Sequence, residues 1–203
     1  MGFVPFRFSL VPWGMSLRVV NPWTGDELAT VPLATAADAD RAVARAVEAF
    51  AKTRIAPRYA RSELLEGIAA RLVEEKEAFA ALLSAEAGKP LAAARVEVDR
   101  AVITFRLGAE VARTLVGEQI PLDGTATTAN VDGYALRAPR GPILGISPFN
   151  FPLNLVAHKV APALAVGAPI VLKPAPQTPL TALKLGALIS ELAPHTPWLQ
   201  VVP

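Results

Sequence analysis

Residues 143–179, ILGISPFNFPLNLVAHKVAPALAVGAPIVLKPAPQTP, decide the fold class of this chain. The stretch contains two short apolar runs, and each is followed by a turn with proline and then by a longer segment of helical character. A third apolar run comes later, near the end of the sequence. The predicted order is strand 143–147, helix 152–167, strand 169–172, helix 179–193 and strand 199–202. This β-α-β-α-β order is typical of a doubly wound parallel sheet, in which right-handed crossovers place both helices on one face.

The residues before Arg140 predict two short strands followed by a mainly helical region. Turn chemistry at 21–26 separates the two strands. Gly88 is expected to end one helix and Pro90 to begin the next. The predicted elements are strands 17–20 and 28–31, a helix from about 36, a helix after Pro57, a helix through 79–83, a helix from 90 to 116, a loop at 117–130 and a strand at 131–138.

Helical spacing of apolar residues predicts which face of each helix is buried. Gly133 is expected to mark a β-bulge in the strand at 131–138. The predicted buried faces comprise Ala42, Val43, Val47 and Phe50 in the first helix, Leu64, Leu65, Ile68, Leu72 and Val73 in the second, and Val98, Val102, Phe105, Ala109 and Ala112 in the fourth.

Composition bounds the class of protein. The 203 residues are 52% hydrophobic and 19% charged, which suffices for one sizeable core and argues against disorder. The net charge is +2 without any block of like charges, so we expect no nucleic-acid partner. The longest apolar stretch, 160–172, is short and interrupted by prolines, so we expect no membrane span. The chain has no cysteine and two histidines, which fits a cytoplasmic protein and gives no basis for a metal site.

Two polar residues stand at the ends of the predicted strands, where open α/β sheets bind ligands. Asn150 follows the first strand, and its side-chain amide is a neutral donor suited to an oxyanion. The alternative is that Asn150 only forms a turn or caps a helix. Lys173 follows the second strand and suits ribose hydroxyls or a phosphate. The alternative for Lys173 is a solvated surface lysine.

Several segments in the same order resemble the aldehyde dehydrogenase superfamily. The PFNFP sequence at 148–152 and the strand end VLKPA at 171–175 resemble two motifs of its nucleotide-binding half. NPWTGD at 21–26 resembles an early turn of the family, and LQVVP at 199–203 resembles a later strand. EAGKP at 86–90, followed by Glu97-Val98, resembles its paired helices. The resemblance covers nearly all of residues 16–203.

This resemblance implies NAD or NADP bound to an atypical Rossmann-type domain and oxidation of an aldehyde to a carboxylate. In the family a cysteine thiolate attacks the aldehyde and a glutamate later activates water. By motif, Asn150 matches the oxyanion-hole asparagine and Lys173 the lysine on the adenosine ribose. Ser147, Pro148 and Phe149 match the strand end along the cofactor. Pro176 stands where the family often has a glutamate that accepts ribose hydroxyl bonds, which puts a strict preference for NAD in doubt.

The resemblance also implies a division of the chain. We expect an N-terminal arm at 1–15, strands and helices of the cofactor domain at 16–130, a bridging strand of the oligomerisation type at 131–140, and the first half of the Rossmann-type sheet at 141–203. The fold class is therefore α/β, with N-terminal helices and the first β-α-β-α-β half of the sheet.

The absence of cysteine indicates that the nucleophile lies outside these residues. We therefore expect a truncated chain that is inactive alone and belongs to a homo-oligomer acting on a small aldehyde in its full-length form. The alternative is a non-catalytic fragment that serves as an interaction module, or a pseudogene product.

Overall fold

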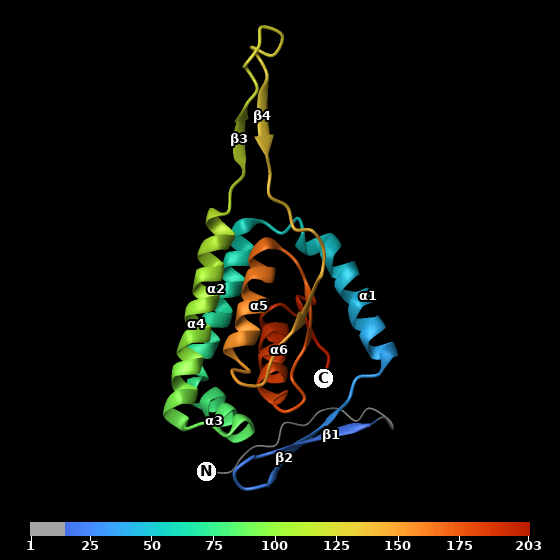
Figure 1. The fold of residues 1–203 in the computed structure, drawn as a ribbon, viewed down its shortest axis with the longest axis vertical. Coiled ribbons are helices and arrows are strands. Elements are labelled where there is room, and N and C mark those ends of the chain that lie inside the picture. Colours follow the sequence, from blue (N-terminus) through green and yellow to red (C-terminus); the bar gives the residue numbers. More distant parts are fainter. Residues whose placement is uncertain (1–14) are drawn as a thin grey trace.

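The computed structural model describes residues 15–203, so the predicted arm at 1–15 lies, except for Met15, outside the described residues. Helices and a small parallel sheet form the body, and one hairpin projects from its end (Figure 1). The elements in chain order are β1 Ser16–Val20, β2 Glu27–Pro32, α1 Ala36–Thr53, α2 Arg58–Glu74, α3 Lys76–Ala87, α4 Leu91–Thr114, β3 Glu118–Pro121, β4 Asp132–Ala135, β5 Ile143–Ile146, α5 Asn154–Val166, β6 Ile170–Lys173, α6 Leu180–Leu192 and β7 Leu199–Val201.

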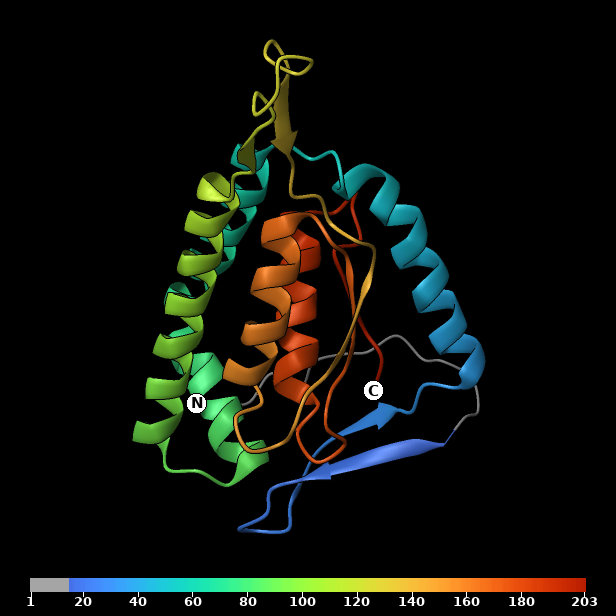
Figure 2. The same ribbon diagram turned by 45° about the horizontal axis from the view of Figure 1, so that its top comes forward.

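The central sheet confirms the predicted β-α-β-α-β unit. Its strands are parallel in the order β5-β6-β7, with Ile143 opposite Ile170 and Ile170 opposite Leu199. Helices α5 and α6 cover one face of this sheet, whereas α1 lies against the other face (Figure 2). Both crossovers are therefore on the same side, as right-handed connections require. The carboxyl ends of the three strands point toward the end of the molecule where α3 and the β1–β2 pair lie (Figure 1).

The largest core lies between α5, α6 and a second helical layer of α2, α3 and α4. Phe79 and Phe105 are fully buried there. Each buried side chain of this size stabilises the fold by roughly 1.5–3 kcal/mol. The predicted face of α4 is confirmed, and that of α2 is confirmed except for Val73, which is 50% exposed. Among the described residues, no helix combines the length and the apolar character needed to cross a bilayer.

The predicted buried face of α1 is confirmed at Ala42 and in part at Phe50, which is half-buried, but it is wrong at Val43 and Val47. Val43 and Val47 are 51% and 58% exposed, and the buried stripe consists of Ala42, Ala46 and Ala49. Small side chains let the helix approach the sheet closely beside Val171. Two neighbouring stripes of α1 are apolar, and spacing alone does not distinguish between them.

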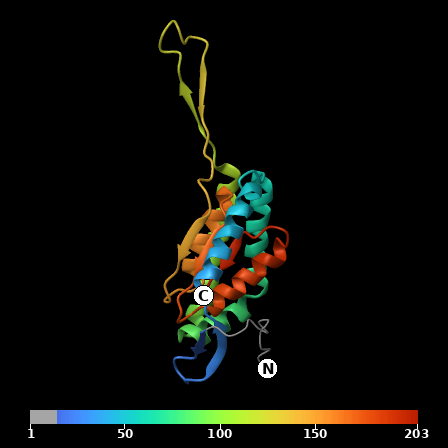
Figure 3. The ribbon, with the colours of Figure 1, turned by 90° about the vertical axis from the view of Figure 1, so that its right-hand side faces the viewer.

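Residues 117–138 form a projecting hairpin rather than a loop followed by a strand (Figure 3). β3 occupies 118–121, where a loop was expected, and pairs antiparallel with β4. β4 is shorter than the predicted strand, and Gly133 lies in regular register with no bulge. A Cβ on Gly133 would lie 2.8 Å from Leu122 Cδ1, so the glycine relieves crowding. Both strands are almost wholly exposed, and β3 was missed because Glu118–Pro121 has no apolar alternation that would identify a strand.

Candidate functional site

The ends of β5 and β6 lie side by side and bring all six predicted site residues to one edge of the sheet. The amide of Ser147 donates to the carbonyl oxygen of Lys173 at 3.1 Å. Beyond the strands, the hydroxyl of Thr178 donates to the carbonyl oxygen of Phe149 at 3.4 Å. These bonds connect the loop 147–153 to the loop 174–179, so the two predicted segments form one continuous surface.

Burial separates these six residues into two groups. Ser147 is buried at 5% exposure, and its backbone amide is used in the strand pairing. Phe149 is 56% exposed. The remaining predicted residues, Pro148, Asn150, Lys173 and Pro176, are also exposed. The structure therefore presents an aromatic ring, a neutral amide and a cation to solvent at the carboxyl edge of the sheet.

The chemistry of this edge fits the ribose part of a dinucleotide. Within the described residues, the ammonium of Lys173 donates one hydrogen bond, to the carbonyl oxygen of Pro174 at the long distance of 3.3 Å. An ammonium has three hydrogens, so it retains donors for hydroxyl or phosphate oxygens. Pro176 offers no side-chain acceptor and no negative charge at this edge. Lys173 could therefore donate to a ribose hydroxyl, and no negative charge at position 176 would repel a 2′-phosphate.

The loop that carries Asn150 is held by Lys89, at the turn between α3 and α4. The ammonium of Lys89 donates to the carbonyl oxygen of Asn150 at 3.0 Å and lies 4.6 Å from the centre of the Phe151 ring. It also forms an ion pair with Glu97, whose side chain is fully buried. One cation thus contacts two successive residues of the loop.

Glu97 accepts the first amides of α5. One of its carboxylate oxygens accepts from the amides of Leu153 at 2.9 Å and Asn154 at 3.1 Å. Among the described residues, α5 has no capping side chain of its own. The first amides of a helix have no partner within the helix, and a carboxylate also suits the positive end of the helix dipole. Glu97 therefore caps α5 from a distant part of the sequence.

Glu86 caps α6 in the same way. Its two oxygens accept from the amides of Leu180 at 2.8 Å and Thr181 at 3.0 Å, and the hydroxyl of Thr181 also donates to it. Burial raises the pKa of Glu86 to about 7, and the nearby charge of Glu97 adds to this, whereas the hydrogen bonds from Thr181 and Leu180 lower the pKa. Glu86 has no cationic partner among residues 15–203.

Sequence reasoning did not find these capping roles. Glu86, Lys89 and Glu97 entered only through the resemblance, without a function. For the predicted helix after Pro152 a signal was present, because Phe151 before it offers no side-chain acceptor, whereas Thr178 before Pro179 gave no such signal. In the structure both helices begin one or two residues later, so Leu153 and Pro179 occupy the capping positions and neither side chain accepts a hydrogen bond. Such helices require an acceptor from elsewhere in the fold. Spacing does not say which acidic residue supplies it.

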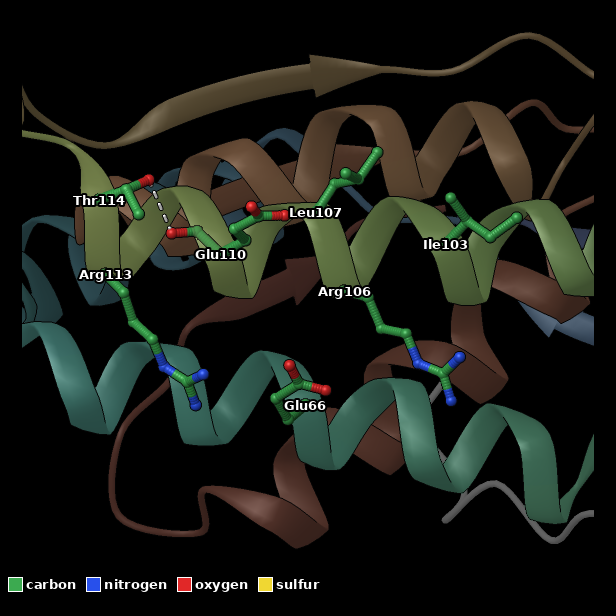
Figure 4. A pocket seen from close by; sticks show the side chains of 7 residues that line it. All are labelled: Glu66, Ile103, Arg106, Leu107, Glu110, Arg113 and Thr114. Carbon is green, nitrogen blue, oxygen red and sulfur yellow. Dashed lines mark hydrogen bonds between the residues drawn. The ribbon is translucent and has the colours of Figure 1, made fainter.

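One groove of the described residues lies away from the strand ends. It is a shallow groove of about 310 Å³ between α2 and α4, toward the projecting hairpin. Arg106 and Arg113 reach from α4 toward α2 on either side of Glu66 (Figure 4). Acidic and basic side chains balance there, and the strand ends do not contribute to its lining. The groove is therefore no candidate for the nucleotide site.

Comparison with known proteins decides the family. The profile described as "Aldehyde dehydrogenase family" matches residues 13–203. The chain belongs to this family. An aldehyde dehydrogenase of Priestia aryabhattai, 3-sulfolactaldehyde dehydrogenase, is 40% identical over 175 residues, which cover 86% of this chain and 36% of that protein.

Solved aldehyde dehydrogenases confirm the fold class. Aldehyde dehydrogenase 21 from Physcomitrella patens, in complex with the reaction product succinate, is 42% identical with a TM-score of 0.91, covering 96% of this chain and 40% of that one. Glyceraldehyde-3-phosphate dehydrogenase from Methanocaldococcus jannaschii, complexed with NADP, is 33% identical with a TM-score of 0.86, covering 92% and 40%. This aldehyde dehydrogenase chain therefore spans about two fifths of the length of its solved relatives and corresponds to their N-terminal region.

Proposed function

We propose that these residues supply the first half of the nucleotide-binding domain of an NAD- or NADP-dependent aldehyde dehydrogenase, which oxidises an aldehyde to a carboxylate. The observation that carries the proposal is the bond between Ser147 and Lys173, because it brings the Asn150 loop and the lysine to one edge. The NADP complex of the Methanocaldococcus jannaschii relative supports this class of cofactor.

Each site residue has a defined task in this proposal. Lys173 donates to hydroxyls of the adenosine ribose, and Ser147, Pro148 and Phe149 form the surface along which the cofactor lies. The side-chain amide of Asn150 donates to the oxygen of the aldehyde as negative charge develops on it. The bound nucleotide supplies the hydride acceptor. The chain contains no cysteine, so these 203 residues bind nucleotide and do not by themselves oxidise aldehydes.

Nucleotide binding by this chain tests the role of Lys173. Titration calorimetry with NADP+ is expected to show a loss of affinity of about tenfold or more in Lys173→Ala, because a hydrogen bond to a charged group contributes roughly 1.5–3 kcal/mol. Lys52→Ala is the matched control, since Lys52 is an exposed lysine in the last turn of α1. Equal affinities in the two variants would contradict the assignment.

A variant at Pro176 tests which of the two nucleotides the site prefers. A proline leaves a 2′-phosphate without repulsion at this position, so we expect NADP+ to be accepted. Pro176→Glu restores an acceptor for ribose hydroxyls and adds a negative charge. The ratio of the NAD+ and NADP+ dissociation constants is expected to shift toward NAD+ in this variant. An unchanged ratio would remove Pro176 from the cofactor site.

The mass and activity of the natural product test the whole proposal. A species of more than twice 21.4 kDa, isolated from its own cells, that reduces NAD(P)+ when an aldehyde is added would support it. In that enzyme, Asn150→Ala is expected to lower kcat by about 10²–10³-fold, as removal of an oxyanion donor does elsewhere. A product of 21.4 kDa without nucleotide affinity would instead favour the interaction module or pseudogene product.

We also propose that the β3–β4 hairpin mediates homo-oligomer contacts. It projects from the body (Figure 3) and exposes Tyr134 by 67% and Leu136 by 85%. Exposed apolar side chains on a projecting strand pair suit an interface between subunits. Leu136→Asp is expected to lower the oligomeric state measured by light scattering, whereas Asp123→Asn, at the tip region, leaves it unchanged.

A further inference from the structure

We propose that Lys89 and Glu97 are positioning residues that together fix the loop carrying Asn150. Neither side chain touches substrate in this proposal. They act through the backbone of residues 150–154, which the pair holds at both ends. The inference rests on the proposed oxyanion role of Asn150 and deepens it.

Glu97 holds the far end of the loop. Its side chain is fully buried, and one oxygen accepts from the amides of Leu153 and Asn154 while the other pairs with Lys89. Both oxygens of the carboxylate are therefore engaged, and rotation of the group would break several bonds at once. The start of α5 is thus tied to α4.

Lys89 holds the near end of the loop. Its side chain is 14% exposed, and its ammonium contacts the Glu97 carboxylate, the carbonyl oxygen of Asn150 and the ring of Phe151. Its own backbone is fixed as well, because the hydroxyl of Ser84 donates to the Lys89 carbonyl oxygen at 2.8 Å. The cation is thereby held at a defined place next to Asn150.

Position matters more for Asn150 than for an ordinary surface asparagine. An oxyanion donor acts only within about 2.7–3.1 Å of the developing charge. A misplacement of about 1 Å caused by a distant substitution lowers a rate by about 10²-fold. Loss of the Lys89–Glu97 pair therefore affects catalysis without removing any group that touches the substrate.

Glu86 supplies a matched control. It is the same residue type, is also buried and also caps a helix, but its bonds go to Leu180 and Thr181 at the start of α6. It makes no hydrogen bond to the Asn150 loop within the described residues. A general loss of stability affects both caps, whereas loss of positioning affects only the cap of α5.

The first experiment follows the side-chain amide of Asn150 by 15N NMR in this chain, with Asn150→Ala to assign the signal. Lys89→Met is expected to shift this signal and to accelerate hydrogen exchange at Leu153 and Asn154 by about tenfold or more, because those amides lose part of their restraint. Lys89→Arg is expected to restore both, since it keeps the charge and the donors. Glu86→Gln is expected to alter exchange at Leu180 and Thr181 and to leave the Asn150 signal in place.

A double variant that removes both charges is the control for loss of the fold. Lys89→Met alone leaves a buried carboxylate without its cation, which destabilises a protein, whereas removal of both charges together is often tolerated. The double variant Lys89→Met/Glu97→Gln is therefore measured beside it and is expected to shift the Asn150 signal in a folded chain. An unmoved signal in the double variant, or an equal movement in Glu86→Gln, would overturn the proposal.

Kinetics of the natural dehydrogenase then separate this inference from the proposed function. Lys89→Met is expected to lower kcat by about 10²-fold with the affinity for nucleotide unchanged. If Asn150→Ala leaves kcat unchanged, the oxyanion role fails while the NMR result on the loop stands. If Asn150→Ala lowers kcat and Lys89→Met does not, the positioning role fails while the proposed function stands.

Discussion

Helices α5 and α6 are both capped by a buried glutamate, but only the glutamate at α5 has a cation beside it among residues 15–203. Each starts near a proline, and each receives a buried glutamate from the α3–α4 region. The cap of α5, Glu97, is paired with Lys89, whereas the cap of α6, Glu86, has no cation beside it among residues 15–203. The pKa of Glu86 is accordingly raised to about 7 by burial. The cap that orders the Asn150 loop is thus the one that has a cation beside it.

The largest expected effect is the loss of the paired cap. Glu97→Ala leaves Lys89 largely buried without its partner and two amides without an acceptor, so the free energy of unfolding should fall by about 3–5 kcal/mol. Glu86→Ala leaves no cation without its partner, so the free energy of unfolding should fall by only about 1–3 kcal/mol. Chemical denaturation of the two variants measures the difference. Equal losses would show that the ion pair does not distinguish the two caps.

The unpaired cap predicts a dependence of stability on pH. The pKa of Glu86 is raised in the folded chain from its ordinary value of 4.5 to about 7, so the folded state holds this proton more tightly than the unfolded state does. Its stabilising contribution is full below pH 4.5 and is lost as the pH rises to about 7, by an amount of roughly 3 kcal/mol. Denaturant midpoints measured across this window in the wild type and in Glu86→Gln test the prediction. The variant should lack this component, and an identical slope in both proteins would contradict it.

A substitution at Gly88, in the turn between Glu86 and Glu97, is expected to have a smaller effect on stability. Gly88 has φ +64°, and a Cβ there would lie 2.6 Å from Cγ of Pro22. Gly88→Ala should therefore lower the free energy of unfolding by about 1–2 kcal/mol. Thermal denaturation should show no comparable loss for Gly124→Ala, because nothing lies within 4 Å of a Cβ at that position. Similar losses in both variants would show that neither the positive φ nor the crowding at Gly88 is the cause.

The smallest effect is expected for an exposed ion pair in the same two helices. Arg95 of α4 contacts Glu77 of α3 at 2.8 Å, but both side chains are well exposed. Exposed pairs contribute about 0.2–1 kcal/mol, so Glu77→Gln should change stability by less than about 1 kcal/mol. A loss in denaturation experiments as large as that of Glu97→Ala would show that burial does not set the strength of these pairs.

The sequence by itself determined the order of elements in the body of this protein. Prolines and Gly88 mark where helices begin and end because they act on the local backbone, and the apolar faces of α2 and α4 follow from helical spacing. The two strand ends with Asn150 and Lys173 were likewise recognisable from residues close in sequence. Each of these features depends on interactions within a few residues.

Only the tertiary structure decided the features that depend on distant partners. The buried stripe of α1 depends on how closely the helix approaches the sheet, and the β3–β4 pairing joins strands without a buried face. The contact of Lys89 with Asn150 joins residues 61 positions apart. The secondary-structure preferences of neighbouring residues do not predict such contacts. Their free energy arises only when separate elements exclude water and satisfy each other's polar groups.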